Sequence, residues 1–273
     1  MDVSGYAFIV GGGSGIGRAS ALGFAKEGAA GVMVADIDVA AATAVAAECK
    51  SVASNPGFKA EAVHIDVTLE ESVGLATAHA SKTFGRIDYC VTCAGIGTQD
   101  AVEISEANVA EFRRFMDVNV TGTFLVTRAV SAVMKRQDPT PVSNQPPERA
   151  VTRGTIVNMG SGQSFVPGFG QTQYTTSKHA VLGLSRNAAL DNVQYGIRVN
   201  CLCPSWVDTP LVERAKAGTP GLSDAINNLV PMGRVARPEE VSDAIIFLSS
   251  PRSSYVTGSD FVIDGGTILR LKF

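Results

Sequence analysis

Short runs of β-branched and other apolar residues alternate along the chain with longer stretches in which apolar positions recur every three to four residues. This alternation is typical of βαβ units, in which crossover helices join parallel strands. We therefore predict an α/β fold with a doubly wound parallel sheet of about seven strands and helices on both faces. The predicted strands are Tyr6–Val10, Val32–Asp36, Ala62–Ile65, Ile87–Thr92, Thr155–Met159, Arg198–Leu202 and Asp260–Ile263.

Length and composition indicate one globular domain. The chain has 273 residues, of which 45% are hydrophobic and 18% charged, so it is too apolar for a disordered chain and short for two full domains. We expect a single domain over residues 1–273.

The formal net charge of −3 offers no basic surface for nucleic acid. No apolar run reaches about 18 residues, and the first residues lead directly into a strand, so we expect a soluble, cytoplasmic protein with no membrane partner.

The cysteines and histidines predict neither a disulfide framework nor a metal site. The five cysteines are an odd number, and four of them lie in strand-like apolar runs. Cys90 and Cys93 form a C-x-x-C pair, but on an extended segment they point to opposite faces. We predict buried structural thiols. His64, His79 and His179 lie far apart without ligand spacing, so no metal is expected.

Residues 136–153 differ in composition from the rest of the chain, with four prolines and few apolar residues. We predict a surface loop here, a solvated insertion without a catalytic role. It leads into the amino end of the fifth strand, whereas ligands of open α/β sheets bind at the carboxyl ends of the strands. The insertion is therefore expected on the side away from an active site, and the alternative is a loop that docks a partner.

Two predicted helices, at Val120–Met134 and Thr175–Leu190, are apolar or small around most of their circumference. One face of each covers the sheet, and the other faces need a further partner. Burial against a second copy of the chain would supply one. We therefore predict a homo-oligomer.

A glycine-rich turn follows the first predicted strand and opens a helix. It reads Gly11-Gly12-Gly13-Ser14-Gly15-Ile16-Gly17. Glycines at such a junction allow tight turning and bring backbone N–H groups to a pyrophosphate, whose charge the helix N-terminus favours. Because the turn lies in the first βαβ unit, we predict a Rossmann-type dinucleotide-binding domain.

Asp36 ends the second predicted strand, nineteen positions beyond Gly17. A carboxylate there accepts hydrogen bonds from the adenosine ribose and repels a 2′-phosphate by on the order of 1–4 kcal/mol. The sequence therefore favours NAD(H), and the alternative is an NADPH-dependent ketoreductase. A purely structural role, as the N-cap of the next helix, fits Asp38 better than Asp36.

Tyr174 and Lys178 lie four positions apart in a predicted helix, so they share one face with Cβ atoms about 5–6 Å apart. A phenol, with an ordinary pKa near 10, acts as acid or base at neutral pH only if its anion is stabilised, which a neighbouring ammonium does. Ser161 follows the fifth predicted strand, thirteen residues upstream of Tyr174. Its hydroxyl is expected at the carboxyl edge of the sheet, where it can polarise a substrate oxygen.

These residues resemble the short-chain dehydrogenase/reductase family, and the resemblance covers essentially the whole chain. The glycine turn is similar to the family's T-G-x-x-x-G-x-G, and Asp66-Val67 is similar to its adenine-contacting pair. Cys203–Thr209 resembles its P-G segment beside the nicotinamide, and Asp264-Gly265-Gly266 its C-terminal D-G. The family's catalytic tetrad is matched in order and spacing by Asn119, Ser161, Tyr174 and Lys178.

The resemblance implies an NAD-dependent oxidoreductase acting on CH–OH groups, and a homotetramer. Tyr174 would exchange a proton with the substrate oxygen, and Ser161 would polarise that oxygen. Lys178 would lower the pKa of Tyr174 and bind the nicotinamide ribose, while Asn119 would hold a proton-relay water. The implied cofactor-binding residues are Gly11, Ser14, Gly15, Ile16, Gly17, Asp36, Ile37, Asp66, Val67, Cys93, Ala94, Gly95, Tyr174, Lys178, Pro204, Val207 and Thr209.

Three positions depart from the family pattern. Val10 replaces the threonine of the glycine turn, Thr92-Cys93-Ala94-Gly95 replaces N-N-A-G, and Ser205 replaces the glycine of the P-G segment. None of them belongs to the tetrad. We expect them to affect local rigidity around adenine and nicotinamide more than activity.

In this family the loop after the sixth strand, here about residues 205–231, selects the substrate together with residues after the fourth and fifth strands. Most of the candidate lining residues are apolar, and this region offers no basic clamp for a phosphate or a carboxylate apart from Arg214 and Lys216. We predict a hydrophobic secondary alcohol or ketone, polycyclic or terpenoid-like. The alternative of another class is a non-catalytic dinucleotide-sensing module. The lining candidates are Ile96, Gln163, Phe165, Phe169, Trp206, Leu211 and Val212.

Overall fold

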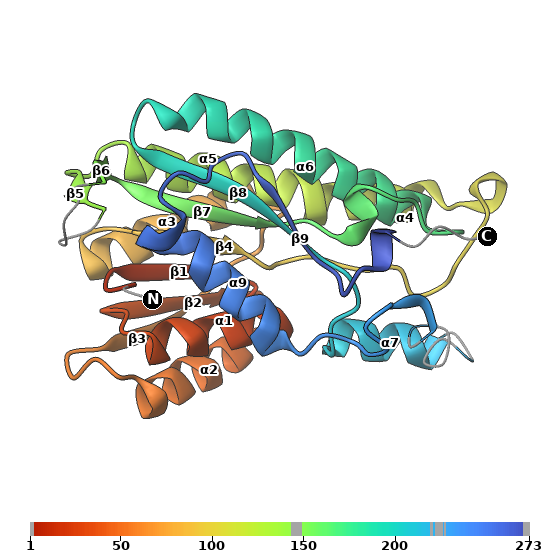
Figure 1. Ribbon diagram of the computed structural model, residues 1–273, viewed down its shortest axis with the longest axis horizontal. Coiled ribbons are helices and arrows are strands. Elements are labelled where there is room, and N and C mark those ends of the chain that lie inside the picture. Colours follow the sequence, from red (N-terminus) through yellow and green to blue (C-terminus); the bar gives the residue numbers. More distant parts are fainter. Residues whose placement is uncertain (1–2, 143–148, 219–220, 222–225, 227, 270–273) are drawn as a thin grey trace.

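The fold is a seven-stranded parallel sheet covered by helices on both faces (Figure 1). The computed structural model describes residues 3–142, 149–218, 221, 226 and 228–269. The prediction of a doubly wound α/β fold is confirmed. Across the sheet the strands follow the order β3 (Lys59–His64), β2 (Gly31–Asp36), β1 (Tyr6–Val10), β4 (Tyr89–Thr92), β7 (Gly154–Met159), β8 (Ile197–Pro204) and β9 (Asp260–Ile263).

All seven predicted strands are present, and the first and last have the predicted bounds. The largest difference is β3, which begins at Lys59 rather than at Ala62. Because β3 is an edge strand, its early residues Lys59 and Glu61 are exposed and polar. A search for apolar runs detects buried strands and therefore misses this half of an edge strand.

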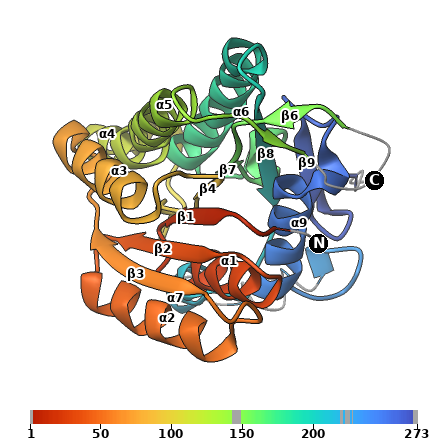
Figure 2. The same ribbon diagram turned by 90° about the vertical axis from the view of Figure 1, so that its left-hand side faces the viewer.

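The helices form two layers, which Figure 2 shows end-on. One layer contains α1 (Gly15–Lys26), α2 (Val39–Val52) and α9 (Pro238–Ser249), and the other α3 (Glu70–Phe84), α5 (Gly122–Met134) and α6 (Thr172–Val193). The short helices α4 (Val109–Phe115) and α7 (Pro210–Gly218) lie toward the carboxyl ends of the strands.

The core is divided by the sheet into two apolar clusters, one under each helical layer. Strand β1 contributes to both, because successive side chains alternate between faces: Ala7 and Ile9 pack on one side, and Phe8 and Val10 on the other. All four are at most 1% exposed. Because the central strands are buried on both faces, their sequences are continuous apolar runs.

The insertion at residues 136–153 lies at the amino end of β7, away from α7 (Figure 1). It contains a pair of short antiparallel strands, β5 (Thr140–Pro141) and β6 (Val151–Thr152), where we predicted a loop. Residues 143–148 of the insertion lie outside the described residues. The Gln137 side chain anchors it, because its Nε2 donates to the carbonyls of Ile87 and Arg153 at 3.0 and 2.8 Å.

The prediction that the helix at Thr175–Leu190 is apolar or small around most of its circumference is wrong for its outer face. That face of α6 exposes mainly polar residues, among them His179, Arg186 and Asn187, together with Leu190. Helix α5 fits the prediction better, since Phe124 is 47% exposed on its outer face. Within the described residues, no helix is long and apolar enough to cross a membrane.

Candidate active site

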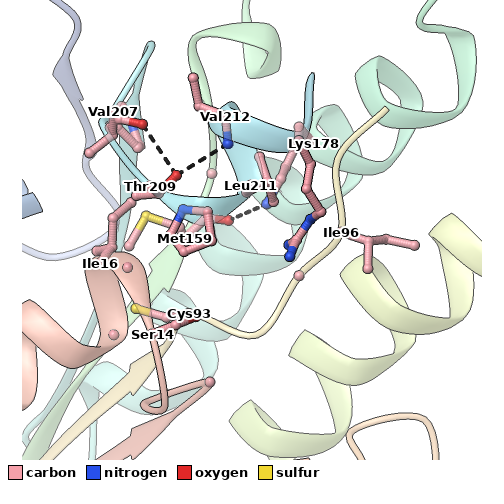
Figure 3. Close-up of a pocket in the computed structure, with 18 of the residues that line it drawn as sticks. Ser14, Ile16, Cys93, Ile96, Met159, Lys178, Val207, Thr209, Leu211 and Val212 are labelled. Carbon is pink, nitrogen blue, oxygen red and sulfur yellow. Dashed lines mark hydrogen bonds between the residues drawn. The ribbon is translucent and has the colours of Figure 1, made fainter. Parts of the chain in front are cut away.

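A cavity of about 170 Å³ opens at the carboxyl ends of the strands (Figure 3). Its walls come from the glycine turn, from the segments after β4, β7 and β8, and from α6 and α7. These segments are distant in sequence, and the parallel sheet brings their ends to one edge. This is the edge at which ligands of open α/β sheets bind.

The glycine turn and the start of α1 form a cradle for an anion. Gly15, Ile16 and Gly17 begin α1 and line the cavity. The first hydrogen bond across this turn joins the Arg18 N–H to the Ser14 carbonyl, so the preceding N–H groups have no partner within the helix. Ser14 adds no side-chain cap, and the first turn of α1 has no acidic residue. The cradle therefore fits the pyrophosphate of a dinucleotide.

Close backbone contact explains why the cradle needs glycine. A Cβ atom on Gly17 would stand 2.0 Å from the Gly11 carbonyl oxygen. Gly15 has a φ of +52°, in the left-handed region that glycine adopts easily. The turn can therefore bring its N–H groups close to a ligand only with these residue types.

Asp36 lies directly beside this cradle. Its Oδ2 accepts the Gly13 N–H at 2.8 Å, and its Oδ1 accepts the Asp38 N–H at 3.0 Å. Asp38 caps α2 by accepting two backbone N–H groups, as predicted. The next residue, Ile37, is 66% exposed. A carboxylate and an apolar side chain thus occupy the end of β2.

Of the other predicted cofactor-binding residues, Cys93 and Gly95 line the cavity, whereas Ala94, Asp66 and Val67 are not among its lining residues. The Ala94 N–H donates to the Val10 carbonyl at 3.0 Å, which ties the end of β4 to the end of β1. Asp66 accepts from the backbone and the hydroxyl of Thr68. Val67 is buried against α5, where its side chain touches Gly122.

Tyr174 and Lys178 project from one face of α6 into the cavity. The Lys178 Nζ lies 5.6 Å from the centroid of the Tyr174 ring. It also donates to the Met159 carbonyl at 2.9 Å, the bond drawn in Figure 3. Phe115 packs edge-on against the Tyr174 ring, with centroids 6.3 Å apart. The ammonium of Lys178 is thereby held beside the Tyr174 ring.

Ser161 follows β7 and is buried, and its neighbour Gly160 lines the cavity, whereas Ser161 is not among the lining residues. Its side chain caps a short 3₁₀ helix by accepting the Gln163 N–H at 3.1 Å. Ser164 completes the capping box and donates to the Lys178 carbonyl at 2.8 Å. The segment after β7 is thus joined by a hydrogen bond to α6 at Lys178.

Asn119 lies in a π-helical segment, Met116–Thr121, between α4 and α5. Its side chain accepts the Ile96 N–H at 2.9 Å and donates to the Ile96 carbonyl at 3.0 Å. The same Nδ2 donates to the Ser177 hydroxyl at 3.0 Å. A π-helical turn is often found at a functional site, and this one joins the segment after β4 to α6.

The end of β8 and α7 form the remaining wall. Pro204, Val207 and Thr209 line the cavity, and the Thr209 hydroxyl bonds to the Val207 carbonyl and the Val212 N–H (Figure 3). In α7, Leu211 packs against Gly97, so that a Cβ atom on Gly97 would lie 2.9 Å from Leu211 Cδ2.

Only part of the predicted substrate lining faces the cavity. Ile96, Leu211, Val212 and Arg214 line it. Trp206 packs instead with Val212, Ile226 and Val230, and Phe169 is 82% exposed.

The candidates that follow β7 also lie outside the cavity lining. Phe165 packs against a small apolar cluster that includes Cys201 and Cys203 of β8. The Gln163 side chain forms hydrogen bonds with Gln171 and Thr175. Residues 219–220, 222–225 and 227 of the predicted substrate loop lie outside the described residues.

Sequence reasoning missed several residues that position the site. Met159 supplies the carbonyl that holds Lys178, Phe115 supports Tyr174, and Ser177 bonds to Asn119. A backbone carbonyl carries no side-chain signal. Phe115 stands four residues before Asn119, and this helical spacing could have suggested a shared face.

Cys93 corrects the prediction that the cysteines are uniformly buried structural thiols, because it is partly exposed and lines the cavity. Cys49, the cysteine outside the predicted strand-like runs, is buried in α2, as predicted. Desolvation nevertheless raises the pKa of the Cys93 thiol to about 12, opposed by the positive charge of Lys178.

We expect native Cys93 to resist iodoacetamide at pH 8, because the reactive thiolate is scarce far below a pKa of about 12. Peptide mass spectrometry after timed labelling measures this, with the urea-unfolded protein as the control. Labelling of native Cys93 as fast as in the unfolded chain would contradict the expectation.

The fold and the cradle define a dinucleotide-binding α/β protein with a tyrosine–lysine pair in its cavity. A protein-family model described as enoyl-(acyl carrier protein) reductase matches residues 11–267. Short-chain dehydrogenase fogB of Aspergillus ruber is 59% identical over 269 residues, which cover 98% of each chain. This chain belongs to the short-chain dehydrogenase/reductase family of nicotinamide-dependent oxidoreductases.

More distant relatives share the fold. The 2,5-dichloro-2,5-cyclohexadiene-1,4-diol dehydrogenase of Sphingobium indicum is 38% identical over 267 residues, 97% of this chain and 98% of that protein. A short-chain type dehydrogenase/reductase from Mycobacterium marinum superimposes with a TM-score of 0.85 at 34% identity, covering 97% and 96% of the two chains. A gluconate 5-dehydrogenase from Burkholderia cenocepacia, in complex with NADP and tartrate, gives 0.83 at 29% identity over the same shares.

Proposed function

We propose that this protein interconverts a secondary alcohol and a ketone with NAD(H) as its coenzyme. The observation that carries the proposal is the Tyr174–Lys178 pair, which lines the same cavity as the glycine cradle. When bound, the nicotinamide accepts or supplies the hydride. Gly11, Ser14, Gly15, Ile16 and Gly17 would hold its pyrophosphate.

Tyr174 is the group that exchanges a proton with the substrate oxygen. In the oxidation direction its phenolate accepts the hydroxyl proton, and in reduction its phenol returns one. Lys178 stabilises the phenolate and would bind the nicotinamide ribose, and its tether to the Met159 carbonyl holds it in place for both tasks. Ser161 would polarise the substrate oxygen, and Asn119 would hold the water that relays the proton to solvent.

The substrate is proposed to be hydrophobic, and its class polycyclic or terpenoid-like. Ile96, Leu211 and Val212 give the cavity an apolar wall, and one relative is named for a substrate that is a chlorinated ring bearing two alcohols. The test is NADH formation, followed by absorbance, with cyclic secondary alcohols and with small hydroxy acids. Faster turnover of the hydroxy acids would reject this substrate class and point to Arg214 as an anion-binding residue.

Asp36 is proposed to select NAD(H) by repelling a 2′-phosphate. For Asp36→Asn we expect the ratio of kcat/KM for NAD to that for NADP to fall about ten- to several-hundred-fold, because on the order of 1–4 kcal/mol of repulsion is removed. Asp38→Asn is the matched control, since asparagine also caps helices well. A wild-type preference for NADP, the coenzyme bound in one structural neighbour, would overturn this assignment.

The chain is further proposed to form a homo-oligomer, a tetramer by analogy with its family, with α5 in the contact. Phe124 on α5 is 47% exposed, and a symmetric helix contact would bury it. We expect Phe124→Asp to lower the mass measured by light scattering at micromolar concentration, whereas Leu75→Asp on α3 leaves it unchanged. A monomeric wild type would contradict the proposal.

A further inference from the structure

A second cavity, of about 490 Å³, lies at the amino ends of the strands, opposite the candidate active site. Its floor is formed by the starts of β1, β4 and β7, and one wall by the insertion, through Thr140, Pro141, Val142 and Thr152. Figure 1 shows β5 and β6 at this end of the sheet and α7 at the other. No step of the proposed reaction takes place in this cavity. The charged and polar residues that line it therefore need a separate explanation.

Two arginines give the cavity a positive charge. The Arg86 Nε pairs with Asp88 Oδ1 at 2.6 Å, and Asp88 is the carboxylate among the described lining residues. Arg198 forms no ion pair within the described residues. Its guanidinium donates instead to the carbonyls of Val256 and Leu248, at 2.9 and 2.8 Å. Burial lowers the pKa of Arg198 to about 10, so it still carries its charge at neutral pH. Among the residues that the structure describes, no carboxylate pairs with that charge.

Three buried polar atoms of lining residues have no hydrogen-bond partner among the described residues: Arg86 Nη2, Thr155 Oγ1 and Ser249 Oγ. Thr155 is 4% exposed and Ser249 3%. A buried donor without a partner costs free energy, so each such group requires an explanation. Three of them around one cavity indicate a ligand that accepts hydrogen bonds.

Strand register places these groups together. Thr155 on β7 is the Cα partner of Tyr89 on β4 and of Arg198 on β8. Partners across neighbouring parallel strands share a face of the sheet, so the threonine hydroxyl lies on the same face as the Arg198 side chain. Ser249 stands between Leu248 and Ser250, whose carbonyls both accept from Arg198 Nη2.

We propose that this cavity is a binding site for a small oxyanion, a carboxylate or a phosphate group carried by a metabolite. Arg86 and Arg198 supply the positive charge, and Thr155 and Ser249 supply hydroxyl donors. Guanidinium groups suit planar carboxylates and phosphates because their donors are fixed in a fork. The volume of about 490 Å³ is in the range typical of small-molecule sites.

Isothermal titration calorimetry with inorganic phosphate and with malonate, at matched ionic strength, tests the proposal on the full chain saturated with NADH. Bound NADH occupies the glycine cradle, so binding that persists comes from elsewhere. We expect saturable binding of one of the two probes, and the better probe identifies the oxyanion. Arg86→Gln and Thr155→Val should each weaken it about ten- to a hundred-fold.

The matched control is Arg128→Gln, which removes an exposed arginine paired with Glu70 far from this cavity and should leave anion affinity unchanged. Thermal unfolding of each variant with NADH checks that it is folded. Thr155→Val preserves side-chain shape, so it remains informative if Arg86→Gln unfolds. The absence of saturable binding, or equal affinity in the wild type and both variants, would overturn the proposal.

Discussion

Replacing Tyr174 by phenylalanine should reduce kcat by about 10²–10⁴-fold while NADH still binds, because the change removes the hydroxyl that we propose exchanges a proton with the substrate oxygen. The ring stays, so its edge-on contact with Phe115 and its place beside Lys178 are kept. Steady-state NADH formation gives kcat, and fluorescence titration gives the affinity for NADH.

Tyr255→Phe is the matched control, since Tyr255 is fully exposed and loses the same hydroxyl far from the cavity. If Tyr174→Phe lost activity and NADH binding together, the tyrosine would be structural rather than catalytic. If it retained full turnover, proton transfer by Tyr174 would be excluded. A wild type that binds NADH but transfers no hydride with any alcohol or ketone would favour the non-catalytic, dinucleotide-sensing alternative.

Replacing Gly17 by alanine should abolish useful coenzyme affinity, with a loss of at least about a hundred-fold, or about 2.7 kcal/mol. The new methyl group would stand 2.0 Å from the Gly11 carbonyl oxygen, which is backbone and cannot rotate away. The backbone of the cradle must therefore shift, and its N–H groups move away from the positions in which they would bind the pyrophosphate. We also expect overpacking to lower the free energy of unfolding by about 1–3 kcal/mol.

Gly74→Ala in α3 tests the same substitution where a Cβ atom meets nothing within 4 Å. Alanine favours helix by about 0.5–1 kcal/mol over glycine, so this variant should be slightly more stable and bind NADH normally. Thermal unfolding and NADH titration of both variants separate the two effects. Normal NADH affinity in Gly17→Ala would contradict the role assigned to the cradle.

Much of this fold could be predicted because its signals are local. A strand buried on both faces is a continuous apolar run, and a dinucleotide turn needs glycines in a short segment, so β1, β7 and the Gly11–Gly17 turn are visible without coordinates. The edge strand β3 was predicted too short because half of its residues face solvent. The outer face of α6 was misjudged because small residues predict neither burial nor exposure.

The candidate site was predictable only as a set of residue types. The helical spacing places Tyr174 and Lys178 on one face, and strand order places Ser161 at the same edge of the sheet as the cradle. Which side chains of the segments after β7 and β8 enter the cavity depends on loop packing. Phe169 and Trp206 were therefore expected in the lining but lie elsewhere, whereas Ile96 and Leu211 face the cavity.

The sequence by itself determined the parallel α/β architecture, the anion cradle and the identity of the tyrosine–lysine pair, because these depend on neighbours within a few residues. Tertiary structure alone decided that the Met159 carbonyl holds Lys178, that Asn119 bonds to Ile96 and Ser177, and that Arg86, Thr155 and Arg198 meet in a second cavity. These contacts join segments separated by 19 to 112 positions. Such pairs lie close together only after the sheet has brought the ends of its strands to common edges.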